Sequence, residues 1–239
     1  MTKRQEVKAK RHQAETRQRL ITIIIIIAGA LLIVGVLIYP SLQPIGDIKI
    51  PPASTRTMVK DNTLGDPNAP VKVEEYADFQ CPACAIWSQN IEHQFLDKYV
   101  QTGKVQFIFH LYSFIDDRST TQESKNATGA AYCAMDQGKF WEYHDMLFAN
   151  QTGENVGDFT DRRLAAFANK LGLNMSQFNS CYNGGKGKYT QQVLDEKAAA
   201  VSLGINSTPS FVVDGKLVPL IKYNDLDAAI DAALAAKSK

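Results

Sequence analysis

The sequence predicts an α/β fold: a short sheet with helices on both faces, interrupted by an all-helical insertion and preceded by one transmembrane helix. Two observations lead to this prediction. An uncharged apolar run extends from Leu20 to Tyr39. Beyond it, the hydrophobic periodicity predicts strand–helix–strand, then a block of helices, then helix–hairpin–helix.

The apolar run is long enough to cross a bilayer. Twenty helical residues at about 1.5 Å each span roughly 30 Å. Residues 1–19 carry seven basic side chains and two acidic ones, and such a basic segment stays on the cytoplasmic side. A cleaved secretory signal is the alternative, but its apolar part is normally about 7–15 residues. Residues 20–39 are therefore expected to form the uncleaved anchor of a single-pass cell-membrane protein, with the rest of the chain outside the cytoplasm.

Residues 40–62 separate the anchor from the domain. Four prolines and few large apolar residues predict a partly stiff linker. A turn-forming cluster at Gly65–Pro70 opens the domain, expected at residues 63–239. Because the basic excess lies at the N-terminal end rather than on this domain, binding to nucleic acid is not expected.

The domain is predicted element by element from apolar spacing and turn residues. In Val71–Asp78 the alternation places Val71, Val73, Glu75 and Ala77 on one face. Asp214–Gly215 marks a hairpin, and Asn224 is expected to cap the last helix. The helical insertion is expected at about 117–188. The predicted elements are strands at Val71–Asp78, Val105–Tyr112, Ser210–Val213 and Lys216–Leu220, and helices at Pro82–Tyr99, Ala127–Gln137, Lys139–Phe148, Asp161–Leu171, Ser176–Tyr182, Tyr189–Leu203 and Asp225–Ala236.

A Cys-Pro-Ala-Cys motif lies where the first predicted strand meets the first helix. The N–H groups and dipole of a helix start favour a thiolate at Cys81. Pro82 suits the first helical turn, where its missing N–H costs nothing. Cys81 is thus the expected nucleophile, and Cys84, one turn later, the thiol that resolves a mixed disulfide. A plain local crosslink is the alternative.

Two further features accompany the motif. Glu75 is expected to point into the core beneath the cysteines, where a carboxyl group with a raised pKa could take and return the proton of Cys84; a solvent-facing glutamate, as expected for Glu74, is the alternative. Pro209 follows Thr208 at the entry to an internal strand. A cis peptide bond would resolve that conflict, and an ordinary turn is the alternative.

Cys133 and Cys181 both fall in the helical insertion. We expect a structural disulfide between them; a second redox pair is the alternative. A four-cysteine zinc site normally needs two close pairs, and these two cysteines stand far apart. No metal or other cofactor is expected, and His93, His110 and His144 are interpreted as ordinary core or surface residues.

The stretch GDPNAPVKVEEYADFQCPAC, with an acid six residues before the first cysteine, resembles the DsbA family of the thioredoxin superfamily, as does STPSFVVDG. The resemblance runs from about Leu64 to the C-terminus and implies a thioredoxin-like fold with a helical insertion. It implies that Cys81 and Cys84 are the redox pair and Glu75 the buried acid. It further implies that Pro209 is cis and that Thr208 contacts the substrate backbone.

That resemblance implies a protein disulfide oxidoreductase that oxidises reduced exported proteins. We expect it to be a monomer. The resemblance also implies a membrane partner that reoxidises it, such as a quinone-linked oxidase of the DsbB or vitamin K epoxide reductase type. Two departures matter: Ala83 stands where the best-known member has histidine, which predicts a milder oxidant, and Thr208 is typical of the disulfide isomerases. An isomerase or reductase therefore remains an alternative, although residues 40–62 are too short for an isomerase's dimerisation domain. A membrane-anchored binding module with structural disulfides is the third possibility.

Overall fold

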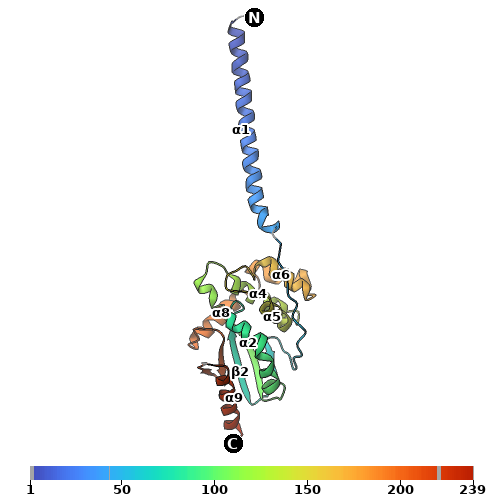
Figure 1. Cartoon of the computed structure of the whole chain (residues 1–239), viewed down its shortest axis with the longest axis vertical. Helices are drawn as coiled ribbons and strands as arrows, with labels where there is room; N and C mark the ends of the chain where they lie inside the picture. Colours follow the sequence, from blue (N-terminus) through green and yellow to red (C-terminus); the bar gives the residue numbers. More distant parts are fainter. Residues whose placement is uncertain (1–2, 43, 220–221, 239) are drawn as a thin grey trace. The chain divides into compact units, whose positions relative to one another are not determined.

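The computed structural model describes residues 3–42, 44–219 and 222–238. The chain divides into two compact units, Met1–Gly46 and Asp47–Lys239. The first unit contains helix α1, Lys3–Leu42 (Figure 1). Within α1, Thr16–Tyr39 is long and apolar enough to cross a membrane, a property that signal sequences share.

The second unit is built on a mixed five-stranded sheet. Its strands are β1 (Thr63–Leu64), β2 (Val71–Ala77), β3 (Val105–Leu111), β4 (Ser210–Val213) and β5 (Lys216–Val218). In the order β1-β3-β2-β4-β5, β2 and β3 pair in parallel and the other neighbours are antiparallel. The strand predictions are confirmed except for β1, which was not predicted. Leu220, the end of the last predicted strand, lies outside the described residues.

The two faces of the sheet are covered by different helices. Alternation along β2 buries Val71, Val73, Glu75 and Ala77 on one face, as predicted. Side chains of α2 and α9 pack into the core on this face, whereas α8 contributes Ala200 to the cluster around Tyr76 on the other. The sheet is therefore covered on both faces, and Glu75 is enclosed.

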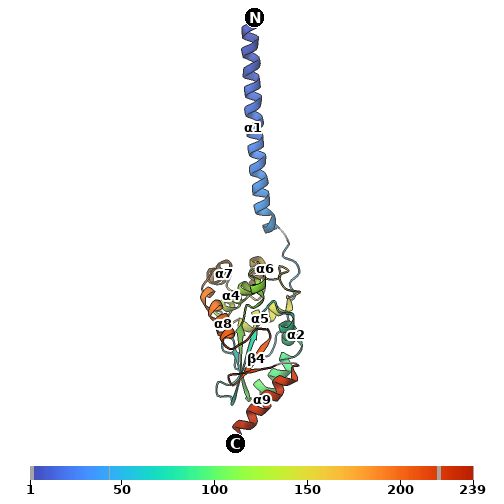
Figure 2. The ribbon, with the colours of Figure 1, turned by 90° about the vertical axis from the view of Figure 1, so that its left-hand side faces the viewer.

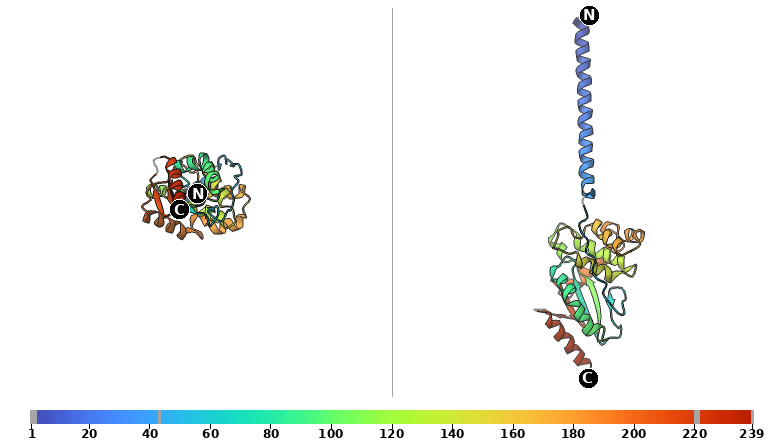
Figure 3. Two further views of the ribbon diagram at one scale, coloured as in Figure 1. Left: turned by 90° about the horizontal axis from the view of Figure 1, so that it is seen from below. Right: turned by 45° about the vertical axis from the view of Figure 1, so that its right-hand side comes forward.

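Helices account for the rest of the second unit. The helical segments are α2 (Pro82–Asn90), α3 (Glu92–Phe95), η1 (Leu96–Val100), η2 (Ile115–Arg118), α4 (Glu123–Met135), α5 (Phe140–Ala149), α6 (Asp161–Lys170), α7 (Met175–Tyr182), η3 (Asn183–Gly185), α8 (Thr190–Ser202) and α9 (Asn224–Lys237). Helices α4 to α7 form the insertion between β3 and β4. They gather at one end of the sheet, away from the C-terminal end of α9 (Figure 2, Figure 3).

Two helix predictions need correction. The single helix predicted at Pro82–Tyr99 is broken at Ile91, whose φ of −125° is not helical. Apolar spacing could not show the break because it continues through both pieces. Asn224 is not a cap but the first helical residue of α9. The carboxylate of Asp225 accepts the Lys222 N–H at 2.8 Å instead.

Residues 40–62 were predicted to be a partly stiff linker, but from Asp47 onward the chain belongs to the second unit and is bonded to it. Lys49 exchanges two 2.8 Å hydrogen bonds with the Asn150 side chain. Arg56 is buried between two carboxylates, and the Asn62 amide donates to the Phe109 carbonyl at 2.8 Å. The prolines indicated an extended segment correctly, but its polar anchors lie on elements 36 or more residues away in sequence, beyond what local patterns show.

Candidate active site

The Cys-Pro-Ala-Cys motif lies at the junction of β2 and α2. Cys81 is the N-cap of α2, with extended backbone angles, and Pro82 is its first helical residue. The Cys81 N–H donates to the Asp78 carbonyl at 3.0 Å, which closes the turn before the helix. Of the first turn of the helix, the backbone N–H groups of Ala83 and Cys84 interact with the Cys81 sulfur.

Both thiols of the motif are free and buried, and they differ in acidity. Cys81 is 7% exposed and Cys84 is 0% exposed. Hydrogen bonds from the Cys84 thiol and Thr208, together with the backbone N–H groups of Cys84 and Ala83, outweigh burial and lower the pKa of Cys81 to about 6. Burial, then the neighbouring Cys81, raises the pKa of Cys84 well above its ordinary value. The pair therefore combines one acidic thiol, Cys81, with one thiol that stays protonated, Cys84.

Glu75 lies in the core behind the cysteines, as its position in β2 predicted, and is 0% exposed. The Trp87 indole N–H donates to its Oε2 at 2.9 Å. In the described part of the chain, its Oε1 has no hydrogen-bond partner. Burial, then the charge of Glu92, raises the pKa of Glu75 well above its ordinary value, against the Trp87 bond. A carboxyl group held protonated in this way can pass a proton to a neighbouring sulfur.

The Thr208–Pro209 loop lies against Cys81. The peptide bond between the two residues is cis. The Cys81 sulfur lies 3.3 Å from the Thr208 carbonyl oxygen, and both loop residues are half-buried. The loop thus leaves polar backbone beside the reactive sulfur.

Sequence reasoning missed Gln80, the residue before the nucleophile. Its buried amide donates to the Ser124 hydroxyl at 2.8 Å and accepts the Asn155 N–H at 2.7 Å. Gln151 donates to its carbonyl at 2.7 Å. Gln80 therefore ties the start of α2 to the helical insertion. Its place beside Cys81 was the available signal, but its partners are tertiary.

Asp78 belongs to the same polar network. It accepts the Gln80 and Ile115 N–H groups, each at 2.9 Å, and the Ser124 hydroxyl at 2.7 Å. Burial raises the pKa of Asp78 to about 7 against these hydrogen bonds. The turn that presents Cys81 is thus fixed by buried polar contacts.

The residues predicted to be ordinary fall into different environments. His93 is exposed and faces Asp97. Glu74, expected to face solvent, is half-buried between Lys72 and His110. His144 is fully buried beside Asp145 and Glu92.

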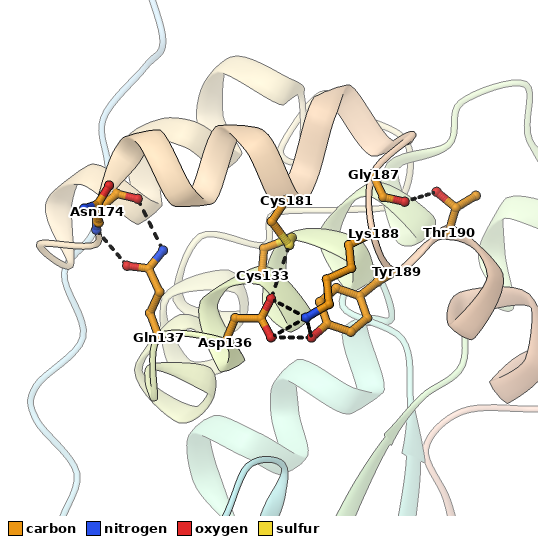
Figure 4. Close-up of a disulfide and its surroundings, with 9 residues drawn as sticks. All are labelled: Cys133, Asp136, Gln137, Asn174, Cys181, Gly187, Lys188, Tyr189 and Thr190. Atoms are coloured by element: carbon orange, nitrogen blue, oxygen red, sulfur yellow. Dashed lines mark hydrogen bonds and ion pairs between the residues drawn. A yellow bond between two sulfur atoms is a disulfide. The ribbon is translucent and has the colours of Figure 1, made fainter.

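Cys133 and Cys181 are joined in a disulfide within the insertion, between α4 and α7. Beside it, Asp136 pairs with Lys188 at 2.9 Å and accepts the Tyr189 hydroxyl (Figure 4). Because these cysteines bond to each other, they are not available to join Cys81 and Cys84 in a zinc site.

Comparison with known proteins identifies the family of this chain. The family model described as Thioredoxin matches residues 57–232. A probable disulfide bond formation protein D from Bacillus anthracis is 27% identical over 208 residues, 86% of this chain and 92% of the relative. Its counterpart from Bacillus cereus is 30% identical over 174 residues, 72% and 78% of the two chains.

A solved structure agrees at the level of the fold. Oxidised BdbD from Bacillus subtilis matches with a TM-score of 0.64 at 23% identity, over 73% of this chain and 93% of BdbD. The fold and the family match thus come from independent comparisons. The chain belongs to the thioredoxin family and, within it, to the protein disulfide oxidoreductases related to disulfide bond formation protein D.

Proposed function

We propose that this enzyme introduces disulfides into exported proteins through Cys81 and Cys84, as a monomer anchored by α1 with its catalytic unit outside the cytoplasm. The position of Cys81 carries the proposal: it caps the N-terminus of α2 ahead of the fully buried Cys84 and is itself 7% exposed. This environment lowers the pKa of Cys81 to about 6. A stabilised thiolate favours the reduced form, and each pKa unit raises the reduction potential by about 30 mV. The oxidised site therefore tends to accept electrons.

The exchange begins from the Cys81–Cys84 disulfide. A substrate thiolate attacks the Cys81 sulfur, the bond between the two site sulfurs breaks, and Cys84 leaves. Glu75 supplies the proton that Cys84 takes up. A second substrate thiolate then attacks the substrate sulfur of the mixed disulfide and releases the Cys81 thiolate. The substrate loses two electrons, which remain on the reduced site.

Two residues and one partner complete the proposal. Thr208 and Pro209 would receive the substrate backbone beside Cys81. A membrane oxidase linked to quinone, of the DsbB or vitamin K epoxide reductase type, would accept the two electrons and regenerate the disulfide. The Cys133–Cys181 disulfide would only stabilise the insertion.

Oxidative folding of a reduced substrate tests the proposal. The oxidised full-length chain in detergent micelles is mixed with reduced ribonuclease, and recovery of ribonuclease activity is followed. The wild type is expected to accelerate disulfide formation and Cys81→Ser to lose that acceleration. Equal catalysis by Cys81→Ser would refute the role of the motif.

The isomerase or reductase alternative uses the same cysteines in their reduced state, and Thr208 favours it. The reduction potential separates the two functions. A value near that of thioredoxin, about −270 mV, would favour reduction, whereas a clearly higher value would favour oxidation.

A further inference from the structure

We propose that Arg56, in the segment after the apolar helix, is a positioning residue of the redox site: by pairing with Glu92 it holds that buried negative charge beside Glu75 and so controls when Glu75 gives up its proton. The inference deepens the proposed function and rests on its assignment of Glu75. It also gives residues 47–62 a chemical role in place of a spacer role.

Arg56 is fixed by buried partners. Its guanidinium lies 2.8 Å from Glu92 Oε1 and contacts both Asp145 oxygens, at 2.7 and 2.8 Å. The guanidinium also lies over the Trp141 ring, 4.7 Å from its centroid. The Arg56 side chain is 8% exposed and that of Glu92 is 2% exposed. Such a pair differs from a solvated surface ion pair, because an unpaired charge at this depth is costly.

The charged cluster reaches the face of the sheet on which Glu75 lies. Glu75 and Phe109 are partners in the parallel β2–β3 register. The His144 ring packs edge-on against Phe109 with centroids 4.6 Å apart. His144 Nε2 lies 3.9 Å from Glu92 Oε2. One packed path therefore joins Glu92 to the surroundings of Glu75.

The electrostatics agree with this path. After burial, the charge of Glu92 is the largest influence that raises the pKa of Glu75. A buried carboxylate that loses its cationic partner tends to take up a proton instead of remaining charged. Loss of Arg56 would thus remove the negative charge of Glu92 and lower the pKa of Glu75.

Other titratable groups face Glu75 from the neighbouring elements. Cys81 and Cys84 lie on α2 and Tyr223 lies just before α9. Burial, then the charges of Cys84 and Glu75, raises the pKa of Tyr223, so it stays neutral. On α5, hydrogen bonds from His144 and Arg56 overcome burial and lower the pKa of Asp145, so it stays charged. The charge of Glu92, held by Arg56, can be removed by substitution without changing Cys81, Cys84 or Glu75.

The step that tests the inference is the attack of Cys84 on a mixed disulfide at Cys81. The reduced full-length chain in detergent is mixed with excess oxidised glutathione across a pH series. In the first step the Cys81 thiolate attacks one sulfur of oxidised glutathione, the disulfide of glutathione breaks, and one glutathione leaves as the thiolate. In the second step Cys84 loses its proton to Glu75, its sulfur attacks the Cys81 sulfur, and the second glutathione leaves as the thiolate. The rate of that step reports the pH at which Glu75 becomes available as a base.

Glu92→Gln and Arg56→Met are each expected to move the midpoint of this profile to lower pH by roughly one unit. The double variant should match the single variants, because both changes remove the same charge. Arg56→Lys, which keeps the charge, should keep the wild-type midpoint. Lys139→Met, which breaks the exposed Lys139–Glu142 pair, is the matched control and should shift nothing.

Unchanged midpoints in the single variants, or shifts that add in the double variant, would overturn the inference. If Arg56→Met does not fold, Glu92→Gln alone decides. The glutathione reaction is independent of the physiological substrate. Unshifted midpoints together with intact, Cys81-dependent oxidative folding would therefore reject the role of Arg56 and leave the proposed function in place.

Discussion

Cys81 determines the pH dependence of the reduced enzyme. Its pKa falls from an ordinary value of 9.0 to about 6 on folding. A lowered folded pKa means that the thiolate stabilises the folded reduced chain at high pH and that this contribution is lost as pH falls toward 6. A difference of one in pKa corresponds to about 1.4 kcal/mol of folding free energy.

We therefore expect iodoacetamide to label Cys81 with a midpoint near pH 6, well before Cys84. Denaturant unfolding of the reduced chain should show lower stability at pH 6 than at pH 9. The oxidised chain, which has no titrating thiol at this site, is the control for other groups. A labelling midpoint at the ordinary value of 9.0 would contradict the assigned environment.

Residues of the site differ in how visible they are in the sequence. Glu75 could be placed in the core because strand alternation fixes which side chains share a face. Arg56 could not, because its partners Glu92 and Asp145 lie 36 and 89 residues away. From the sequence alone, an arginine in this proline-containing segment is expected to be solvent-exposed. Only the fold brings the carboxylates of Glu92 and Asp145 to Arg56.

Among the elements, the disulfide between α4 and α7 provides the clearest test of roles. Replacing Cys133 and Cys181 by Ser removes a crosslink across 48 residues, worth about 4 kcal/mol in the chain-entropy account. The melting temperature of the oxidised chain should fall by roughly 10 °C, since about 1 kcal/mol corresponds to about 2–4 °C at this size.

Oxidase turnover per folded molecule of that double variant should remain near the wild-type value, measured below its melting temperature by ribonuclease refolding. Neither cysteine begins a helix as Cys81 does, so neither is expected to exchange with substrate. A variant that folds normally but has lost oxidase activity would show that this pair belongs to the redox path.

Elements with a local signature were predicted and those defined by partners were not. The hairpin of β4 and β5 follows from Asp214–Gly215 alone. Strand β1 has only two residues and is defined by its pairing with β3. Two residues are too few to show a period-2 alternation, so the sequence could not predict this strand. The break at Ile91 was likewise hidden, because apolar spacing continues across it.

For the whole molecule, the boundary of the catalytic unit is the testable feature. A chain that begins at Asp47 should fold and keep its activity. One that begins at Thr63 lacks Arg56 and leaves Glu92 and Asp145 without their cation. Breaking a buried pair from one side costs about 3–5 kcal/mol, so its melting temperature should be lower by roughly 10 °C.

Thermal unfolding of the two shortened chains, followed by circular dichroism, measures this difference. A chain that begins at Thr63 and carries Glu92→Gln and Asp145→Asn should recover part of the loss, because neutral amides at these two positions do not need a cationic partner. Equal melting temperatures for the chains beginning at Asp47 and Thr63 would show that residues 47–62 are a spacer after all.

The buried charges have an optical consequence. The chain contains two tryptophans. The indole of Trp87 donates to Glu75, and that of Trp141 lies beneath Arg56. Since indole fluorescence responds to neighbouring charges and sulfurs, the emission of Trp87 should report on the surroundings of the two cysteines. The emission of Trp141 should report on the docking of Arg56 and its segment. The tryptophan fluorescence of the unlabelled protein thus contains two separate signals. Trp141→Phe would leave only the emission of Trp87, the tryptophan beside Glu75.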